Sequence, residues 1–435
     1  MKVHVRDLVA WSNAQQAAGH DGVCIEGATA DSRDVPPGSL FVGIPGERVD
    51  GGLHAAQAIR HGAAAVLIGR EAWSHVKADM AASKAPVLVA DDPVAALGMI
   101  GRAALQQVGA RVVGITGSYG KTSTKDSVVA VLRAAGVRVE GTPGNRNTEV
   151  GVPLSILGLP EDTEVAVIEM GMRGPGQIAE LASLAPPDVA VITGIGPVHL
   201  ELLGTVEAIA AAKAEILEAL APGGVAVVPD DDPLLAPHVD ALPAGIRVVR
   251  FGDEPVVALE LGEMKAWERR NMATATAVAI ALRTPLAPGT VVHLKRSAMR
   301  GIEHALPGGG TLIEDCYNAN PPAMAAALAD LCIRAGRHVA VLADMLELGP
   351  DEDRFHREVG EQAARLGVDL LIAVGSRAAS YPDGATAVAT AVFASTDAAV
   401  AGVPALIEPG DVVLVKGSRG MAMERVATAI RERGA

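Results

Sequence analysis

One stretch of the sequence, residues 111–125, constrains the fold more than any other. It reads Arg-Val-Val-Gly-Ile-Thr-Gly-Ser-Tyr-Gly-Lys-Thr-Ser-Thr-Lys. The apolar run from Val112 to Ile115, followed by glycines, predicts a buried strand, and the apolar spacing after the glycines predicts a helix. A strand, a glycine loop and a helix in this order are typical of an α/β protein with a parallel sheet.

The glycine loop itself predicts a phosphate-binding site. Backbone N–H groups at the start of a helix bind anions, and glycine lets the backbone come close to phosphates. Lys121 can reach the β- and γ-phosphates, and the hydroxyl of Thr122 can bind Mg²⁺. Ile115 stands where the general loop has its first glycine, so the pattern is the variant Thr-Gly-x-x-Gly-Lys-Thr-Ser-Thr. An ordinary strand–turn–helix corner is the alternative, and the position of Gly-Lys-Thr favours phosphate. The predicted nucleotide-binding residues of the loop are Gly117, Ser118, Gly120, Lys121, Thr122 and Ser123.

Length, charge and cysteine content narrow the class of protein. A chain of 435 residues predicts two to four domains. The net charge of −14 argues against general nucleic-acid binding. Three cysteines without metal-binding spacing predict reduced thiols. There is no N-terminal signal region and no apolar run of about 18 residues, so we expect a cytoplasmic protein with no membrane span.

Changes in pattern along the chain predict three domains. Residues 1–90 mix short strands and helices, and Asp91-Asp92-Pro93 follows as a boundary. Residues 91–297 alternate strand and helix patterns, which predicts a mostly parallel sheet covered on both faces. Residues 298–435 alternate again and predict a smaller, Rossmann-like α/β domain.

Polar residues follow the predicted strands of the middle region. Glu169 ends the strand predicted over 165–171, and His199 follows the strand predicted over 188–193. Ligands of open α/β sheets bind at the carboxyl ends of the strands, where Lys121, Glu169 and His199 would gather. The carboxylate and imidazole could bind Mg²⁺ beside ATP. For His199 alone, a loop histidine with satisfied hydrogen bonds is the alternative.

Lys213 is unusual within its own predicted helix. Residues 205–220 predict a helix with Thr205 as N-cap, and Lys213 lies seven residues after Val206, on the apolar face. A buried lysine is costly unless it is paired or modified. Either its amine extends to the surface, or it is carboxylated, which converts a cation into an anion able to bind metal.

These motifs resemble the Mur ligase superfamily, whose members form amide bonds with ATP, and the resemblance covers nearly the whole chain. The glycine loop and the series Glu169, His199 and Lys213 carry it. Three further stretches resemble the branch that adds D-alanyl-D-alanine to UDP-N-acetylmuramoyl-tripeptide in peptidoglycan synthesis: residues 317–321, 344–349 and 416–421. The resemblance implies that the first domain binds the UDP part of the substrate, the middle domain binds ATP, and the last domain closes over ATP and binds the dipeptide.

The resemblance also implies roles for particular residues. The catalytic residues would be Lys121, His199 and Lys213, with Lys213 carboxylated. Mg²⁺ would be bound by Thr122, Glu169, His199 and Lys213. Outside the loop, ATP would contact Asn271, Arg300 and Asp315. Substrate binding is implied for Ser32, Arg33, Arg48, Asn147, Asn318, Asn320, Lys416 and Arg419. For Arg33 and Arg48, guanidinium groups match phosphate geometry, and solvated turns are the alternative. Asn271 is predicted to open a helix over residues 271–282, at which Arg270 and Thr274 replace the family's usual His and Asn near the adenine.

Two other interpretations remain open at this point. Within the enzyme class, the chain could be another Mur-type ligase or a folylpolyglutamate-synthase relative. From a different class, it could be an ATP-driven switch or transport ATPase, which would hydrolyse ATP without an amine acceptor. A monomer is expected. The third residue of the tripeptide could be diaminopimelate or lysine.

Overall fold

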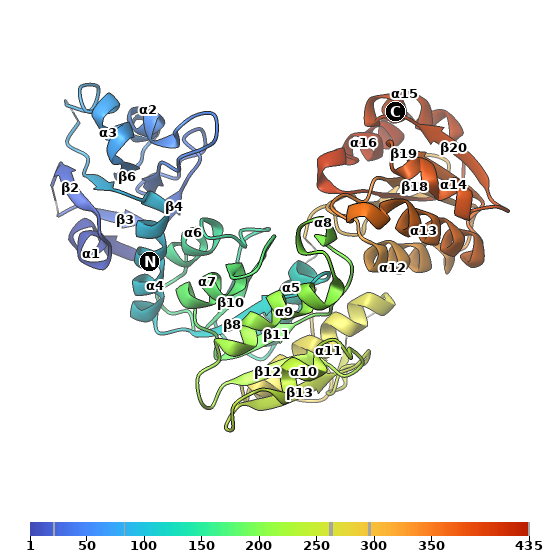
Figure 1. Ribbon diagram of the computed structural model, residues 1–435, viewed down its shortest axis with the longest axis horizontal. Helices are drawn as coiled ribbons and strands as arrows, with labels where there is room; N and C mark the ends of the chain where they lie inside the picture. Colours follow the sequence, from blue (N-terminus) through green and yellow to red (C-terminus); the bar gives the residue numbers. More distant parts are fainter. Residues whose placement is uncertain (21, 82, 261–263, 295–296, 434–435) are drawn as a thin grey trace.

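The protein is an α/β chain in three parts, so the predicted fold class is confirmed. The computed structural model describes residues 1–20, 22–81, 83–260, 264–294 and 297–433. The N-terminal and C-terminal parts lie on opposite sides of the view, and a middle part joins them (Figure 1). Each part contains a sheet that is wholly or largely parallel and is flanked by helices.

The N-terminal part carries a sheet whose described strands run in the order β2-β7-β6-β5-β4. β4 to β7 pair in parallel, whereas β2 pairs antiparallel with β7. β1 and β3 form a separate antiparallel ribbon. The elements are β1 (Lys2–His4), α1 (Val5–Trp11), β2 (Gln15–Ala18), β3 (Cys24–Glu26), β4 (Ala28–Thr29), β5 (Leu40–Val42), η1 (Gly51–His54), α2 (Ala55–Arg60), β6 (Ala65–Gly69), α3 (Arg70–Val76) and β7 (Val87–Ala90).

The middle part carries a sheet that is parallel in all its described strands, in the order β13-β12-β11-β8-β10-β9. A small ribbon of β14 and β15 lies beyond it. The elements are α4 (Pro93–Val108), β8 (Arg111–Thr116), α5 (Lys121–Ala134), β9 (Val139–Gly141), α6 (Gly151–Leu157), β10 (Val165–Glu169), α7 (Gln177–Leu184), β11 (Val189–Ile192), α8 (Leu200–Leu203), α9 (Val206–Glu218), β12 (Val225–Pro229), α10 (Ala236–Asp240), β13 (Arg247–Phe251), β14 (Leu259–Glu260), α11 (Ala266–Ala281) and β15 (Thr290–Val291).

The C-terminal part carries a sheet in the order β16-β17-β21-β18-β19-β20, in which β16 is antiparallel to its neighbour. The elements are β16 (Ile302–Ala305), β17 (Thr311–Asp315), α12 (Pro321–Cys332), β18 (His338–Ala343), η2 (Gly349–Asp351), α13 (Glu352–Leu366), β19 (Leu370–Val374), η3 (Ala378–Ser380), α14 (Tyr381–Gly384), β20 (Ala389–Phe393), α15 (Thr396–Gly402), η4 (Val403–Leu406), β21 (Val412–Lys416), η5 (Arg419–Met421) and α16 (Glu424–Glu432).

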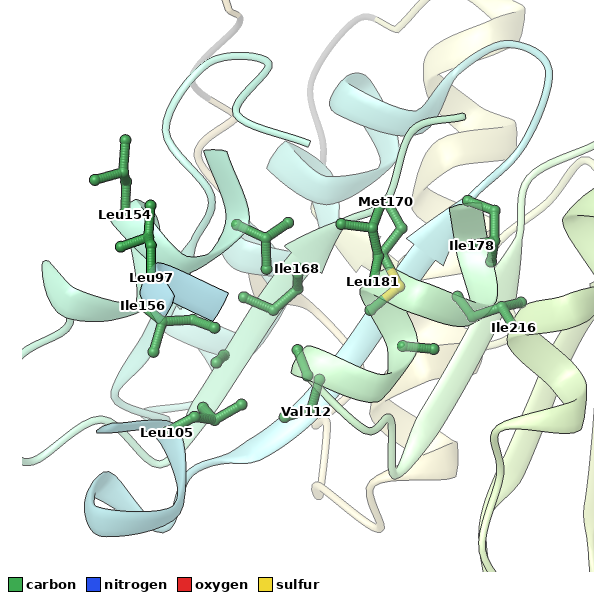
Figure 2. Close-up of a cluster of buried hydrophobic side chains, with 14 of the residues drawn as sticks. Leu97, Leu105, Val112, Leu154, Ile156, Ile168, Met170, Ile178, Leu181 and Ile216 are labelled. Atoms are coloured by element: carbon green, nitrogen blue, oxygen red, sulfur yellow. The ribbon is translucent and has the colours of Figure 1, made fainter. Parts of the chain in front are cut away.

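The central strand β8 is buried on both faces, and for this reason its sequence from Val112 to Ile115 is a continuous apolar run. Successive side chains of a strand point to opposite faces. Val112 therefore packs with Ile168 against one layer of helices, whereas Val113 packs with Val167 on the other side of the sheet. Figure 2 shows the first of these layers, with side chains from α4, α6, α7 and α9 around Val112 and Ile168. The same cluster continues into the N-terminal part through Leu40.

The predicted N-cap of α9 is confirmed. Thr205 caps α9, since its hydroxyl accepts a hydrogen bond from the Ala208 N–H at 3.1 Å. One expected start is wrong: the helix that was to open at Asn271 begins at Ala266. The Lys265 N–H donates to the Glu268 carboxylate at 3.0 Å, and this contact fixes the earlier start. Asn271 therefore lies in the second turn of α11.

No helix in the described residues is long and apolar enough to cross a membrane.

Candidate functional site

The predicted phosphate loop joins β8 to α5 at the carboxyl edge of the middle sheet. Gly117 has φ 152°, and a Cβ there would lie 1.9 Å from the Thr193 hydroxyl, so only glycine fits. The loop is bound to the segment after β11: the Ser118 N–H donates to the Gly194 carbonyl at 2.9 Å, and the Thr193 hydroxyl donates to the Tyr119 carbonyl at 2.5 Å. The loop is therefore held in shape by its neighbour in the sheet.

Lys121 stands at the first position of α5 with its amine folded back over the loop. Nζ donates to the Gly117 carbonyl at 2.6 Å. Burial lowers the pKa of Lys121, while the Glu169 carboxylate acts in the opposite direction. The amine is thus held where an anion on the loop would meet it.

Thr122, Glu169 and Asn147 form a hydrogen-bonded group beside the loop. The Thr122 hydroxyl donates to Glu169 Oε2 at 2.7 Å, and Asn147 Nδ2 donates to Oε1 at 2.8 Å. Glu169 is 1% exposed. A hydroxyl and a carboxylate are oxygen ligands that suit Mg²⁺, which commonly takes one or two protein ligands and completes its shell with water and phosphate oxygens. No cluster of three or more His, Cys, Asp or Glu able to hold a metal occurs in the described residues.

Lys213 is buried in α9 with 1% exposure, so extension of its amine to the surface is ruled out. Within the described part of the chain, its amine has no hydrogen-bond or ion-pair partner. Burial lowers the pKa of Lys213 well below its ordinary value, and the charge of Lys121 adds to this effect. The environment therefore favours the neutral amine.

His199 lies just before α8, and its Nδ1 forms a short contact with Glu347 Oε2. Burial lowers the pKa of His199, and the Glu347 carboxylate opposes this shift. The charges of Lys213 and Lys121 also act on the ring, so the structure brings these three side chains into one electrostatic environment. The alternative considered for His199 was a loop histidine whose ring nitrogens are satisfied by hydrogen bonds. The structure shows such a partner for Nδ1, namely Glu347.

Arg300 reaches the loop from the segment before β16. Its Nη2 donates to the Thr122 hydroxyl at 3.0 Å, and its guanidinium carbon lies 4.0 Å from the centre of the Tyr317 ring. Asn271 also approaches the loop, since its Oδ1 accepts from the Thr124 hydroxyl at 3.0 Å. Two of the residues predicted to contact ATP thus meet the start of α5.

The predicted dipeptide-binding residues form hydrogen bonds and ion pairs with other residues of the C-terminal part. Lys416 is 3% exposed, and its Nζ bonds to Asp315 Oδ2 at 2.6 Å and to the Asn318 carbonyl at 2.9 Å. Asn320 caps α12 by accepting from the Ala323 N–H at 3.0 Å. Arg419 is more exposed and pairs with Glu424 at 2.8 Å.

The predicted UDP-binding residues lie apart from the loop. Arg33 is bound by Asp31 through Nε at 2.9 Å and Nη2 at 2.7 Å. Ser32 is buried, and its carbonyl contacts His61 Nδ1 at 2.8 Å, whereas Arg48 is exposed. No hydrogen bond or ion pair among the described residues joins 30–51 to the phosphate loop.

The two residues of α11 that depart from the family's pattern are bound to neighbouring groups. Arg270 pairs with Asp231 and Asp253, each at 2.6 Å, and the Thr274 hydroxyl donates to the Arg270 carbonyl at 3.0 Å.

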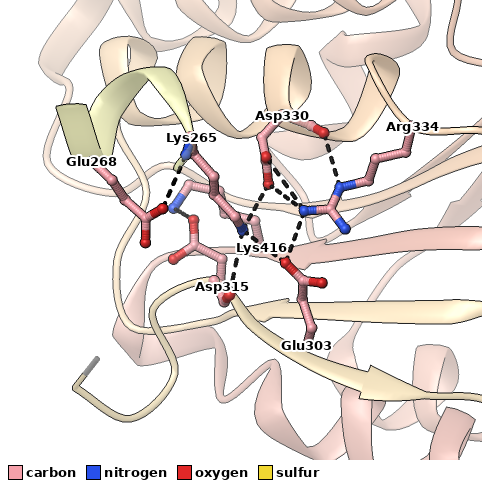
Figure 3. A network of polar contacts seen from close by, with 8 residues as sticks. Lys265, Glu268, Glu303, Asp315, Asp330, Arg334 and Lys416 are labelled. Carbon is pink, nitrogen blue, oxygen red and sulfur yellow. Dashed lines mark hydrogen bonds and ion pairs between the residues drawn. The ribbon is translucent and has the colours of Figure 1, made fainter. Parts of the chain in front are cut away.

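Several contacts between the middle and C-terminal parts were not predicted. Figure 3 shows one group, in which Lys265 Nζ contacts Asp330 at 2.8 Å and Glu303 at 3.3 Å, and Arg334 contacts Glu303 at 2.8 Å. A second group joins Glu347 to His199 and Arg173. The partners lie far apart in sequence, and local patterns carry no signal for such pairs. Glu347 did fall within the motif 344–349.

An open cavity of about 600 Å³ lies on another face of α5, between that helix, the segment at 140–144 and the residues Val291, His293, Ser297 and Ala298. Its lining includes Lys125, Arg133 and His293 and does not include Lys121, Glu169 or His199. The cavity is therefore separate from the site described above.

Comparison with known proteins links these features to one family. A family model described as "Mur ligase family, catalytic domain" matches residues 24–104, "Mur ligase middle domain" matches 115–288, and "Mur ligase, glutamate ligase domain" matches 300–419. The UDP-N-acetylmuramoyl-tripeptide–D-alanyl-D-alanine ligase of Bacillus subtilis is 34% identical, over 95% of this chain and 94% of that protein.

Two solved structures extend the likeness to the whole fold. A crystal structure of MurF from Acinetobacter baumannii superposes with a TM-score of 0.86 at 27% identity, covering 100% of this chain and 99% of that one. MurF ligase from Thermotoga maritima, solved in complex with ADP, gives a TM-score of 0.76 at 29% identity, covering 94% and 97%.

Proposed function

Because the chain belongs to the Mur ligase family, and within it to the UDP-N-acetylmuramoyl-tripeptide–D-alanyl-D-alanine ligases, we propose that it uses ATP to join D-alanyl-D-alanine to UDP-N-acetylmuramoyl-tripeptide. The observation that carries this function is the group formed by the phosphate loop, Lys121, Thr122 and Glu169 at one sheet edge, with Arg300 reaching it from the C-terminal part. Nucleotide binding is supported by the relative that was solved with ADP.

The reaction has two steps. The terminal carboxylate of the tripeptide attacks the γ-phosphorus of ATP, so that the bond to the β-phosphate breaks, ADP leaves and an acyl phosphate forms. The amine of D-alanyl-D-alanine then attacks the acyl carbon, loses a proton, and displaces inorganic phosphate from the tetrahedral intermediate. In the first step Lys121 neutralises charge on the transferring phosphoryl group, and the loop N–H groups bind the phosphates.

The oxygen atoms beside the loop would hold Mg²⁺. We assign Thr122 and Glu169 to one ion, with Asn147 orienting Glu169 through its amide. His199 and Lys213 would hold a second, with Lys213 carboxylated, because its buried and neutral amine is free to add CO₂. Bound Mg²⁺ supplies positive charge that stabilises the transferring phosphoryl group.

Residues of the outer parts would bind the two organic substrates. Arg33, Ser32 and Arg48 would contact the UDP group. Asn318, Asn320, Lys416 and Arg419 would form the dipeptide site, in which Arg419 is the most exposed cation. Arg300 and Asp315 would close over ATP, and closure would keep water from hydrolysing the acyl phosphate.

The product would be a precursor of peptidoglycan, which links the protein to cell wall biogenesis, cell shape and division. The free cysteines Cys24, Cys316 and Cys332 suit a reducing compartment, so we place the reaction in the cytoplasm. We propose that the enzyme acts as a monomer.

A phosphate-release assay tests the function. Four mixtures contain ATP and Mg²⁺ with neither substrate, with the UDP-tripeptide, with the dipeptide, and with both. We expect release only when both are present. Release with ATP alone would support the ATPase interpretation, and release with a single amino acid in place of the dipeptide would support another Mur-type ligase. Parallel assays with lysine-containing and diaminopimelate-containing tripeptides identify the third residue.

A further inference from the structure

Two strained residues of different domains contact each other. Among the described residues, five that are not glycine have a positive φ, and two of these are His199 at 55° and Glu347 at 63°. Such a conformation costs about 1–3 kcal/mol and persists only where the surroundings enforce it, commonly at functional sites. His199 follows β11 of the middle part, whereas Glu347 follows β18 of the C-terminal part, and their side chains meet.

Glu347 also holds a second loop of the middle part. Its Oε1 accepts a hydrogen bond from Arg173 Nη2 at 2.5 Å, while Oε2 contacts His199. Arg173 lies four residues after Glu169, in the loop that follows β10. One carboxylate from the C-terminal part therefore connects two loops of the middle part. The first loop begins after Glu169 of β10, and the second follows β11 and ends at His199. Both side chains are assigned above to Mg²⁺.

The segment that carries Glu347 is itself held by hydrogen bonds within the C-terminal part. The Met345 N–H donates to Nε2 of the fully buried His356 at 3.0 Å, and His356 Nδ1 donates to the Glu352 carbonyl at 2.7 Å. The Leu346 N–H donates to the Ser418 hydroxyl at 2.9 Å. Ser418 lies between Lys416, which ends β21, and Arg419, which begins η5, so the position of Glu347 depends on the segment assigned to the dipeptide.

The contact is part of a close fit between the two domains. The Glu201 N–H donates to the Glu347 carbonyl at 3.3 Å. A Cβ on Gly349 would lie 3.2 Å from the Glu201 nitrogen, so glycine permits the approach. Leu200 packs against the core clusters of both domains. The side-chain contact of His199 thus forms where α8 docks on the C-terminal part.

We propose that Glu347 is a positioning residue for the ligation reaction, which fixes the ring of His199 by accepting a hydrogen bond from its Nδ1–H. A carboxylate on the far nitrogen of a metal-binding histidine sets the tautomer and the orientation of the ring. This inference rests on the proposed function, in which the other nitrogen of His199 faces Mg²⁺. Because the carboxylate comes from the other domain, His199 is held in place only while the C-terminal part is docked on α8.

Three variants separate this role from a loss of folding. Glu347→Leu removes the acceptor, whereas Glu347→Gln keeps one acceptor oxygen. Both side chains are unbranched at Cβ, as glutamate is, so the backbone strain at position 347 changes little. Glu352→Leu is the matched control, because Glu352 pairs with Arg377 inside the C-terminal part and its side chain is 31% exposed against 30% for Glu347.

The first readout needs no ligand. In the ligand-free protein, ¹⁵N chemical shifts of the imidazole nitrogens report the tautomer, and the His199 signals are identified by their loss in His199→Gln. We expect a single Nδ1–H tautomer in wild type and in Glu352→Leu, and a mixture of tautomers in Glu347→Leu. The second readout is steady-state kinetics: kcat of Glu347→Leu should fall about 10–100-fold, with KM for the UDP-tripeptide within about twofold of wild type and Glu347→Gln intermediate in kcat.

Each outcome decides the proposal. An unchanged tautomer in Glu347→Leu, an unchanged kcat, or an equal loss in Glu352→Leu would overturn it. If wild type itself fails to release phosphate with both substrates, the proposed function is wrong, and the tautomer measurement still tests the contact between Glu347 and His199.

Discussion

At the scale of single residues, the amine of Lys121 is the group placed nearest to a bound phosphate. Replacement with alanine removes a positive charge whose one hydrogen bond among the described residues goes to the Gly117 carbonyl of its own loop. We expect Lys121→Ala to lower kcat about 10²–10³-fold, with a melting temperature close to that of wild type. Phosphate release and thermal unfolding measure the two quantities. Lys77→Ala, at an exposed lysine of the N-terminal part, is the control. Wild-type turnover in Lys121→Ala would show that the loop takes no part in the mechanism.

Lys213 offers a test of carboxylation by chemical rescue. Lys213→Ala should lose nearly all activity, because the metal-binding anion is absent. Short carboxylic acids such as acetate should restore part of the turnover by occupying the vacated space. Lys213→Arg should not be rescued, since its side chain stays positive and fills that space. Phosphate release is measured with and without acetate, and near-wild-type activity of Lys213→Ala without acid would show that the lysine is dispensable.

The same residue predicts a dependence of stability on pH. The pKa of Lys213 in the folded state lies well below 10.5, the ordinary lysine value that applies to the unfolded state. Between the folded-state and unfolded-state pKa values, the unfolded state binds more protons, so the free energy of unfolding rises with pH. In CO₂-free buffer, Lys213→Met should therefore be more stable than wild type at neutral pH, with a difference that shrinks as pH approaches 10.5. Urea unfolding at several pH values measures this difference, and a difference that stays constant with pH would contradict a buried neutral amine.

At the scale of elements, the phosphate loop depends on the absence of a side chain at position 117. A Cβ on Gly117 would clash with Thr193, whose segment holds the loop by two hydrogen bonds. Gly117→Ala should therefore lower stability by about 1–3 kcal/mol and abolish nucleotide binding. Calorimetry with ADP and urea unfolding provide the measurements. Gly174→Ala, where a Cβ would meet nothing within 4 Å, is the matched control.

Elements were predictable from the sequence where the signal is local. The apolar run 112–115, the glycines after it and the apolar spacing that follows were enough to predict β8, the loop and α5. The start of α11 was missed because Lys265 is not a usual capping residue, although Glu268 three positions later completes the contact. The burial of Lys213 followed from helical spacing alone. The pairing of Glu347 with His199 did not, since 148 positions separate the partners and glutamate does not favour the left-handed backbone found at position 347.

At the scale of the whole molecule, the middle and C-terminal domains meet through polar contacts at Lys265 and Thr122 and through apolar packing of Leu200. Lys265, the residue before α11, contacts Glu303 and Asp330 of the C-terminal part, and Arg334 contacts the same two carboxylates (Figure 3). Arg300 meets Thr122 across the same junction. Changes in sequence pattern along the chain predicted three domains, whereas the particular contacts between them depend on side-chain geometry that local patterns do not contain.

The last prediction concerns closure of these domains. Arg300 donates to the hydroxyl that is assigned to Mg²⁺, so binding of a nucleotide with its metal must displace the guanidinium from Thr122. The freed arginine and Asp315 would then contact the nucleotide and draw the C-terminal part toward the phosphate loop. We expect the radius of gyration from small-angle scattering to decrease when a non-hydrolysable ATP analogue, Mg²⁺ and the UDP-tripeptide are added together. Arg300→Met should bind the analogue and show a smaller decrease. Equal radii for wild type with and without ligands would show instead that the site is rigid and preformed.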